Sequence, residues 1–228
     1  MNGKLIVIEG LDGSGKNTQT KLLLEYMSQK TNVRHISFPD YNSPSSSLIK
    51  MYLNSEFGGS PSDVNAYAAA SFYAVDRYAS FKKDWEKSYL NGEIILCDRY
   101  TTSNYIYQLS KLDKKYWDEF LFWLDNYEYE KLQIPKPDLV IYLKVPVEIS
   151  QKLMTSRYSG NELKKDLHES DILFLENCAK SADYVSKKYN WKIINCTDNQ
   201  NNILSKELIH EKIVESLLIE QNIKNNSM

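Results

Sequence analysis

A glycine-rich stretch follows the first apolar run of the chain and reads IVIEGLDGSGKNTQ from residue 6 to residue 19. Its spacing fits the pattern G-x-x-x-x-G-K-[ST] at Gly10, Gly15 and Lys16, but the last position is Asn17. An apolar run precedes the glycines and a helical pattern follows them, which is the context of a phosphate-binding loop. The sequence therefore predicts a strand, a phosphate-binding loop and a helix, in that order.

Four apolar runs are continuous rather than alternating, as in strands buried on both faces, and they cover residues 5–9, 93–98, 138–145 and 192–196. A fifth run, 34–38, is weaker. Segments with helical periodicity separate the runs; Leu23, Leu24 and Met27, for example, share one helix face. Strands that alternate with helices predict an α/β fold, in which a five-stranded parallel sheet is covered by helices on both faces. Ligands of such sheets bind beyond the carboxyl ends of the strands.

Composition excludes several classes of protein. The 228 residues suit one large domain, and neither a repeat nor a linker divides residues 1–228. A net charge of -2 offers no general attraction to nucleic acid or to an anionic membrane. Three cysteines without CxxC spacing argue against a disulfide framework and a zinc site. No run approaches about 18 apolar residues, so we expect a cytoplasmic protein that does not span a membrane.

The loop residues are predicted to bind the phosphates of ATP. Glycines let backbone N–H groups turn towards phosphate oxygens, and Lys16 adds a positive charge at the β and γ phosphates. A glycine-rich turn with only a structural role would not require this lysine. The predicted ATP-binding residues are Gly10, Leu11, Asp12, Gly13, Ser14, Gly15, Lys16, Asn17 and Thr18.

Asn17 stands where a hydroxyl that binds Mg²⁺ is expected. Its amide oxygen could face the ion directly or through water, because Mg²⁺ keeps several waters. Thr18 cannot replace the missing hydroxyl, since one helix position turns a side chain by about 100°. Asn17 therefore leaves two alternatives open: an active phosphotransferase with an altered metal ligand, or a catalytically silent nucleotide-binding protein.

A second motif, ILCDRYTTSNYIYQ, covers residues 95–108. A buried strand that ends in an aspartate is the Walker-B arrangement, which predicts Asp98 as a magnesium ligand together with Asn17. The guanidinium of Arg99 can hold the phosphate of an acceptor through two parallel hydrogen bonds. The segment SKLD, 110–113, resembles a guanine-reading motif but lies in a helical region, so we reject a GTPase and interpret SKLD as solvated surface.

Five blocks in order resemble thymidylate kinase, and they read EGLDGSGKNTQ, FPDY (38–41), SFYAVDRYAS (71–80), DRYTTSNYIYQ and PKPDLVIYL (135–143). The resemblance implies the P-loop nucleoside monophosphate kinase fold and phosphoryl transfer from ATP to dTMP with Mg²⁺, which gives dTDP and ADP. It also implies a homodimer. A kinase for another pyrimidine monophosphate or for a deoxynucleoside is the nearest alternative.

The resemblance implies roles for single residues of the acceptor site. Arg99 would hold the dTMP phosphate, Ser103 and Asn104 would contact the base, and Tyr107 would lie beside the sugar. Asp12 would meet the sugar 3'-hydroxyl or a metal-bound water. Because Asn104 can both donate and accept, and an arginine can donate to O4, the site should prefer thymine or uracil to cytosine. A bulky Tyr107 would disfavour a 2'-hydroxyl.

The block SFYAVDR contributes the residues that would grip the base. Tyr73 and Arg77 are four residues apart, so on a helix they share a face and can hold a base by its plane and its edge. Phe72 is the alternative stacking ring. In FPDY, Tyr41 would approach the acceptor phosphate, whereas Asp40 stands where many relatives have arginine.

Some thymidylate kinases carry a basic residue at the loop position that Gly13 occupies here, and others supply that charge from a lid. This chain has polar residues 155–170 after its fourth predicted strand, with Arg157, Lys164 and Lys165. We expect this lid to be flexible without nucleotide and Arg157 to close over the ATP phosphates. The predicted catalytic residues are thus Lys16, Asp12, Arg99 and Arg157; the alternative for the lid is an exposed basic surface.

Overall fold

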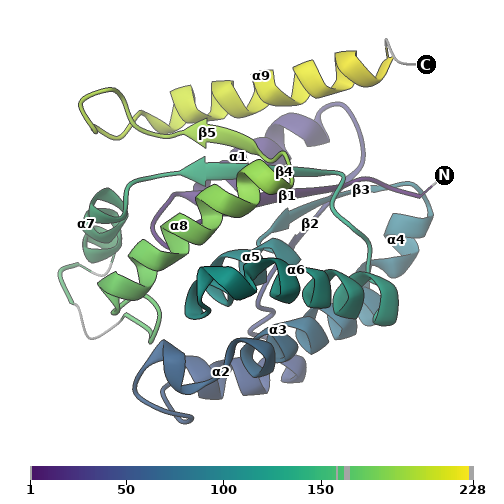
Figure 1. The fold of residues 1–228 in the computed structure, drawn as a ribbon. Helices are drawn as coiled ribbons and strands as arrows, with labels where there is room; N and C mark the ends of the chain where they lie inside the picture. The colour runs from purple at the N-terminus through teal and green to yellow at the C-terminus, as the bar shows by residue number, and fades with distance from the viewer. Residues whose placement is uncertain (1, 158, 162–164, 226–228) are drawn as a thin grey trace.

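The computed structural model describes residues 2–157, 159–161 and 165–225. Every predicted apolar run forms a strand, including the weaker one: β1 (Leu5–Gly10), β2 (Val33–Ser37), β3 (Ile94–Asp98), β4 (Leu139–Lys144) and β5 (Lys192–Asn195). The strands form one sheet in the order β2-β3-β1-β4-β5, and all four neighbouring pairs are parallel (Figure 1). The predicted five-stranded parallel sheet is confirmed.

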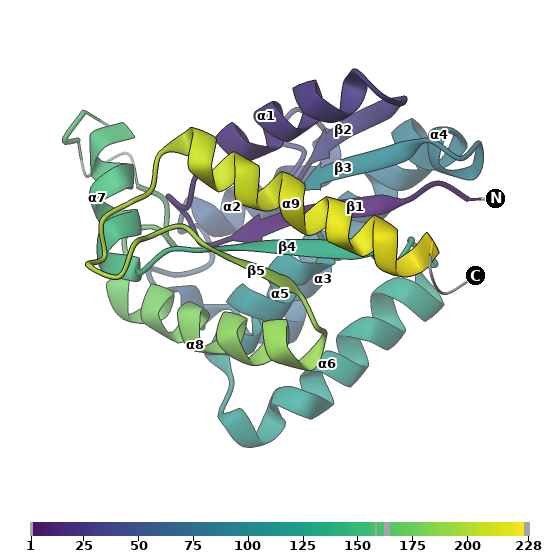
Figure 2. The same ribbon diagram turned by 90° about the horizontal axis from the view of Figure 1, so that it is seen from above.

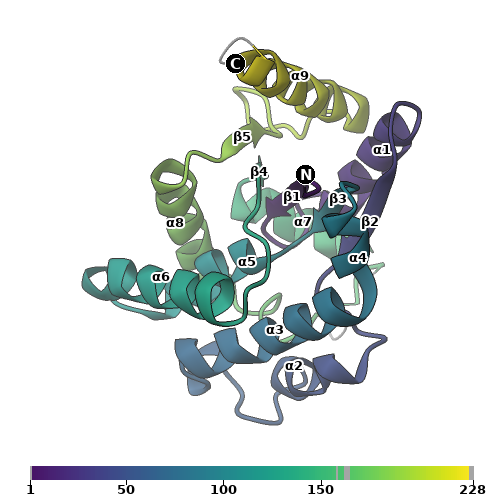
Figure 3. The same ribbon diagram turned by 90° about the vertical axis from the view of Figure 1, so that its right-hand side faces the viewer.

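Helices cover both faces of the sheet, as Figures 2 and 3 show. The α-helices are α1 (Lys16–Ser28), α2 (Ser47–Leu53), α3 (Ala66–Ser80), α4 (Glu86–Leu90), α5 (Thr101–Tyr107), α6 (Trp117–Asp125), α7 (Val147–Arg157), α8 (Ile172–Lys188) and α9 (Lys206–Asn225). Short helical turns are η1 (Pro44–Ser46), η2 (Pro61–Asp63), η4 (Leu109–Lys111) and η5 (Lys114–Tyr116), and two segments are π-helical, η3 (Phe81–Trp85) and η6 (Asn126–Lys131).

The core has one large cluster on each face of the sheet, and a third, smaller cluster contains Tyr52, Val64, Ala69 and Leu167. Successive residues of a strand point to opposite faces, so Leu5 and Val7 of β1 join the cluster with α3, α5, α6 and α8. Ile6 and Ile8 join the cluster with α1 and α9. Because each face needs apolar side chains, the strand sequences are continuous rather than alternating.

Connections at the carboxyl edge of the sheet carry the motifs found in the sequence. The phosphate loop follows β1, Arg99 follows β3, and α7 with the predicted lid follows β4. Phe38 and Pro39, which are joined by a cis peptide bond, follow β2. Since all strands are parallel, these connections meet at one edge.

The interpretation of SKLD as solvated surface is wrong at Lys111. This segment lies in η4 and the turn after it, away from any strand, but the Nζ of Lys111 donates to Tyr52 Oη at 2.7 Å and to the Val64 carbonyl at 3.1 Å. Burial lowers the pKa of Lys111 to about 7. Asp113, by contrast, is exposed.

The three cysteines are free and buried, as core residues are expected to be. In the described part of the chain, no helix has both the length and the apolar character that crossing a membrane requires.

We predict that Ile141→Ala lowers the free energy of unfolding by about 2–5 kcal/mol, because Ile141 of β4 is fully buried between sheet and helices. Ile193→Ala on the neighbouring strand is the control, since this side chain is 39% exposed. Denaturant unfolding should give the control less than half the loss of Ile141→Ala. Equal losses would contradict the assignment of Ile141 to the core.

Candidate active site

The loop between β1 and α1 has the geometry of an anion site. Gly13 and Gly15 have φ values of 77° and 84°, which favour glycine. A Cβ at Gly13 would also lie 2.4 Å from the carbonyl oxygen of Ser150 in α7. Among the described residues, no side chain caps the N-terminus of α1. Its N–H groups and the helix dipole therefore remain available to a phosphate.

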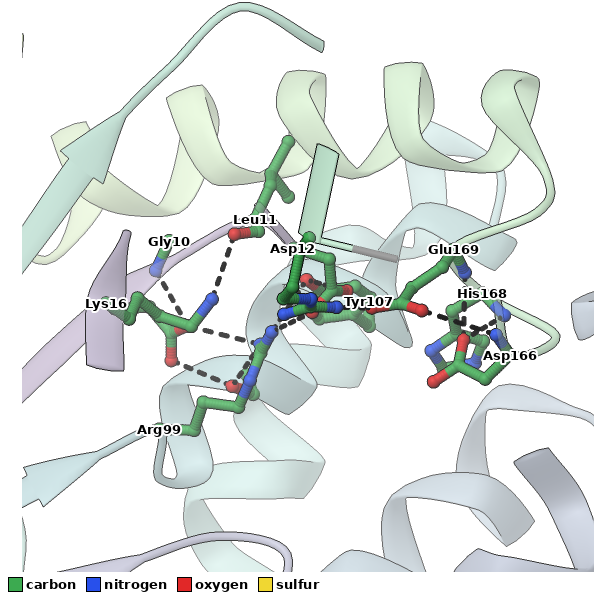
Figure 4. Close-up of polar contacts among 12 residues, drawn as sticks. Gly10, Leu11, Asp12, Lys16, Arg99, Tyr107, Asp166, His168 and Glu169 are labelled. Carbon is green, nitrogen blue, oxygen red and sulfur yellow. Dashed lines mark hydrogen bonds and ion pairs between the residues drawn. The ribbon is translucent and has the colours of Figure 1, made fainter. Parts of the chain in front are cut away.

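Lys16 points into this loop, where its Nζ donates to the carbonyl of Leu11 at 2.9 Å (Figure 4). Burial and the neighbouring positive charge of Arg99 lower the pKa of Lys16 to about 8. Lys16 is thus mostly charged at neutral pH, and a bound phosphate would favour the charged form further.

A cavity at the loop, which we name the phosphate cavity, is lined by most of the residues that are predicted to bind ATP and magnesium. Its lining includes Asp12, Gly13, Gly15, Lys16, Asn17, Thr18, Asp98, Arg99, Arg157 and Lys206. The side chains of Asn17 and Thr18 are exposed. Asp98 Oδ1 is buried and has no hydrogen-bond partner in the part of the chain that the structure describes. A buried carboxylate oxygen without a partner is costly, so this atom fits a cation ligand.

Arg99 lies between the phosphate cavity and a second cavity. Its backbone φ of 64° is left-handed, which is uncommon for a residue other than glycine. The guanidinium forms an ion pair with Asp12, and its Nη1 lies 3.4 Å from Ser103 Oγ and 3.8 Å from Glu9 Oε1 (Figure 4). It also lies over the ring of Tyr107, 5.2 Å from the centroid.

Asp12 is ionised in this arrangement. Burial alone would raise the pKa of its carboxyl, but the charges of Arg99 and Lys16 outweigh burial and lower the pKa to about 2. Tyr107 adds a hydrogen bond from its hydroxyl to Asp12 Oδ2 at 2.8 Å. Asp12 and Arg99 line both cavities, so this ion pair marks the junction between them.

The second cavity, the acceptor cavity, is lined by Asp12, Phe38, Pro39, Tyr41, Leu53, Tyr73, Arg77, Arg99, Tyr100, Ser103, Asn104, Tyr107, Gln108, Asp166 and His168. It brings together all the predicted acceptor residues except Phe72. The Phe72 ring packs instead against Phe57, with centroids 5.8 Å apart. Of the two candidate stacking rings, only Tyr73 is therefore placed at this cavity.

Sequence reasoning missed Glu9, which is fully buried behind the junction. Its Oε1 accepts from the Gly10 N–H at 2.9 Å, and its Oε2 accepts from Thr102 Oγ1 at 2.7 Å and Ser103 Oγ at 2.9 Å. Glu9 thereby ties the phosphate loop to α5. A carboxylate at the end of the apolar run LIVIE was the signal that could have revealed it.

His168 and Asp166, at the start of the segment before α8, were also missed. The His168 ring stacks on Tyr107, with centroids 5.5 Å apart and planes 12° apart, and its Nε2 lies 2.9 Å from Tyr52 Oη. Burial and nearby Lys111 lower the pKa of His168 to about 3, so the ring is neutral. Burial and the Asp12 carboxylate raise the pKa of Asp166 to about 7.

The predicted basic residues of the lid lie in different places. Arg157 lines the phosphate cavity, and its Nη2 pairs with Glu169 Oε1 at 2.7 Å. Lys165 lines a separate cavity beside α7, where its Nζ donates to Gln151 Oε1 at 2.7 Å. Lys164 lies outside the described residues. Of the two described basic residues of the predicted lid, Arg157 is thus the one that lines the phosphate cavity.

Comparisons with a family model and with individual known proteins all indicate the same family. The sequence model of the family described as thymidylate kinase matches residues 8–208. A probable thymidylate kinase from Pyrococcus horikoshii is 33% identical over 170 residues, which are 72% of this chain and 76% of that protein. A thymidylate kinase from Ligilactobacillus salivarius is 28% identical over 210 residues, 91% of this chain and 97% of that protein.

The fold also resembles a solved structure of thymidylate kinase from Candida albicans. The TM-score is 0.73 at 23% identity, with 97% of this chain and 93% of that chain covered. At this identity the likeness concerns the fold alone, and it confirms the predicted P-loop nucleoside monophosphate kinase architecture.

We predict that Asp166→Asn stabilises the protein more at pH 8 than at pH 5. The folded pKa of about 7 lies above the ordinary value of 3.8, so the folded protein binds this proton more tightly than the unfolded chain. The stability that this proton contributes is lost as pH rises through the folded pKa. Asparagine keeps an oxygen for the N–H groups of His168 and Glu169, which Asp166 Oδ1 accepts at 2.9 Å.

Thermal unfolding of the variant and the wild type at both pH values measures this difference. Asp113→Asn, which changes an exposed carboxylate, is the control and should shift the midpoint little at either pH. A gain from Asp166→Asn that is equal at pH 5 and pH 8 would contradict the raised pKa.

Proposed function

Because the chain belongs to the thymidylate kinase family, we propose that it transfers the γ-phosphoryl group of ATP to dTMP and releases dTDP and ADP. The observation that carries this proposal is the junction of the two cavities at Asp12 and Arg99. A donor phosphate held by the loop and an acceptor phosphate held by Arg99 would meet there. Direct transfer between two bound phosphates requires such a junction.

The catalytic roles of Lys16 and Arg99 follow from their positive charges, which match the negative charges of the two phosphates. Lys16 and the loop N–H groups bind the β and γ phosphates of the donor. Arg99 exchanges part of its contact with Asp12 for the acceptor phosphate, whose oxygens suit its planar fork. The attacking phosphate oxygen is already ionised, so no strong general base is needed, and positioning with charge neutralisation supplies the rate.

Asp98 and Asn17 are the residues that we propose for magnesium. When bound there, Mg²⁺ would neutralise part of the negative charge of the phosphates. The buried Oδ1 of Asp98, which has no hydrogen-bond partner among the described residues, supports this assignment. Within the described residues, no group of three or more His, Cys, Asp or Glu side chains is arranged to hold a metal. Such a sparse protein contribution suits Mg²⁺, which is bound largely by waters and substrate phosphates.

The acceptor roles are proposed from the lining of the acceptor cavity. Tyr73 would stack on the base, Arg77 and Asn104 would contact its edge, and Tyr41 would approach the phosphate. The Tyr107 ring is backed by His168 on one side, which holds it against the expected place of the sugar. Ser103 donates to Glu9, so we assign it to the floor of the cavity rather than to strong base recognition.

We further propose that residues 1–228 form one kinase domain, with 155–170 as its lid, and that the protein is a cytoplasmic homodimer. Val75 and Tyr78 on α3 and Phe122 on α6 are exposed apolar side chains that a partner subunit could cover. The proposed partners are ATP, Mg²⁺ and dTMP, without nucleic acid or membrane.

A substrate panel tests the proposed function. ADP production is measured with ATP and Mg²⁺ and each of dTMP, dUMP, UMP, dCMP and thymidine. Faster turnover of dTMP than of the other acceptors supports thymidylate kinase activity. Preference for UMP or thymidine would favour a kinase for another pyrimidine monophosphate or a deoxynucleoside, and ATP binding without any turnover would favour a silent nucleotide-binding protein.

Arg157→Ala should lower kcat by about a hundredfold or more and change the KM for dTMP little, because Arg157 faces the phosphate cavity and not the acceptor cavity. Steady-state kinetics measures both constants. Lys165→Ala is the matched control, since Lys165 lies beside α7 in a different cavity and should leave kcat nearly unchanged. A normal kcat in Arg157→Ala would refute the proposed role of this residue.

Asn17→Thr should leave kcat within about tenfold of the wild type or raise it, a change of barrier below about 1.4 kcal/mol. The reason is that Asp98 and the rest of the loop remain in place, and threonine restores a hydroxyl. The concentration of Mg²⁺ that gives half-maximal activity should fall in the variant. An unchanged magnesium requirement would show that side chain 17 does not act on the metal.

A further inference from the structure

Glu128 is a buried carboxylate that no motif of the sequence contains. It lies in the π-helical segment η6 and is fully buried. Its Oε2 accepts from Arg77 Nε at 2.7 Å, and its Oε1 accepts from Arg77 Nη2 at 2.6 Å. Glu128 does not line the acceptor cavity but holds two residues that do, Arg77 and Asn104.

Asn104 is held in one orientation by these contacts. Its Nδ2 donates to Glu128 Oε1 at 3.1 Å and to the Ala70 carbonyl at 3.2 Å. A side-chain amide nitrogen has two hydrogens, so both are used. Turning the amide over would place its oxygen against a carboxylate and a carbonyl, which both accept. Only Oδ1 of Asn104 is therefore left for a ligand, and the expectation that Asn104 both donates and accepts is corrected.

Arg77 can only donate hydrogen bonds to a ligand in the cavity, whereas Asn104 can only accept them. A guanidinium has five N–H donors, and three are used by the two bonds to Glu128 and by a bond from Nη1 to the Tyr100 carbonyl at 3.4 Å. The remaining donors are on Nη1 and Nη2. The wall of the cavity thus combines a donor from Arg77 with an acceptor from Asn104.

This pair matches one kind of pyrimidine edge. Thymine and uracil present an N3–H donor beside the O4 acceptor, whereas cytosine presents an N3 acceptor beside a 4-amino donor. With cytosine, the N3 acceptor would face the acceptor Oδ1 of Asn104, and the 4-amino donor would face an N–H donor of Arg77. A site of this kind rejects the wrong ligand strongly, because buried polar groups are left unpaired.

We propose that Glu128 is a positioning residue that determines the preference for 4-oxo over 4-amino pyrimidines. It does so by fixing the guanidinium of Arg77 and by accepting one of the two amide hydrogens of Asn104, while the Ala70 carbonyl accepts the other. This inference rests on the proposed function, since it assumes that the acceptor cavity takes the pyrimidine base. A purely structural ion pair would affect folding but would weaken dTMP and dCMP equally.

Glu128→Gln tests the proposal, because glutamine keeps the shape but replaces one of the two acceptor oxygens that hold Arg77 and Asn104 with an NH2 group. Calorimetric dissociation constants are measured for dTMP and dCMP, with thermal unfolding of each protein as a separate readout. We expect the ratio of the two affinities to fall by at least about tenfold, largely through weaker binding of dTMP.

Glu130→Gln is the matched control. Glu130 lies in the same segment, is exposed, and pairs with Lys136 at 3.5 Å. Its variant should keep the affinity ratio within about twofold of the wild type. A folded Glu128→Gln protein with the wild-type ratio would overturn the proposal.

Removing one partner of a buried ion pair is strongly destabilising, so Glu128→Gln could fail to fold. A second measurement therefore uses the wild type, with the side-chain amide of Asn104 observed by NMR and assigned through its loss in Asn104→Ser. Both amide protons should exchange with solvent at least about tenfold more slowly than those of the exposed Asn91, with and without dTMP. Exchange of either proton as fast as in Asn91 would overturn the proposal.

The experiments separate this inference from the proposed function. If the wild type binds dTMP but produces no ADP, the proposed function fails while the affinity ratios still decide the role of Glu128. If dTMP is phosphorylated and the ratio is unchanged in Glu128→Gln, only the inference fails.

Discussion

The ion pair between Asp12 and Arg99 joins the connections that follow β1 and β3, and the two cavities meet at it. Each partner depends on the other: Arg99 keeps Asp12 ionised, and Asp12 compensates a guanidinium that lies close to Lys16. Glu9 lies behind the pair and binds both the loop and α5. The relative placement of the two cavities is therefore set by a small, partly buried network of alternating charges.

Much of the fold could be predicted because its cause is local. A strand buried on both faces must be apolar throughout, and β1, β3 and β4 show that pattern directly. In the described part of the chain, the edge strand β2 pairs only with β3 and is partly exposed, which explains why its run was weaker. The phosphate loop was equally clear, since its glycines and lysine are contiguous in the sequence.

The parts of the site that the sequence did not predict depend on contacts between distant segments. Glu128 meets Arg77, 51 residues earlier, and nothing in the sequence around η6 indicates a buried charge. The ring of His168 stacks on Tyr107 of α5, and Lys111 is buried by α2 and the loop before α3. A polar residue in such a segment has the same local pattern whether it is solvated or paired, so the sequence alone favours the solvated interpretation.

The close approach of Gly13 to the Ser150 carbonyl also restricts how this chain could evolve. A lysine or arginine at position 13 would need α7 to withdraw, and α7 ends in Arg157, which lines the phosphate cavity. A single substitution that adds a cation to the loop would therefore displace Arg157 from its present position. A basic residue at position 13 and the present position of Arg157 are consequently incompatible in this fold unless α7 also changes.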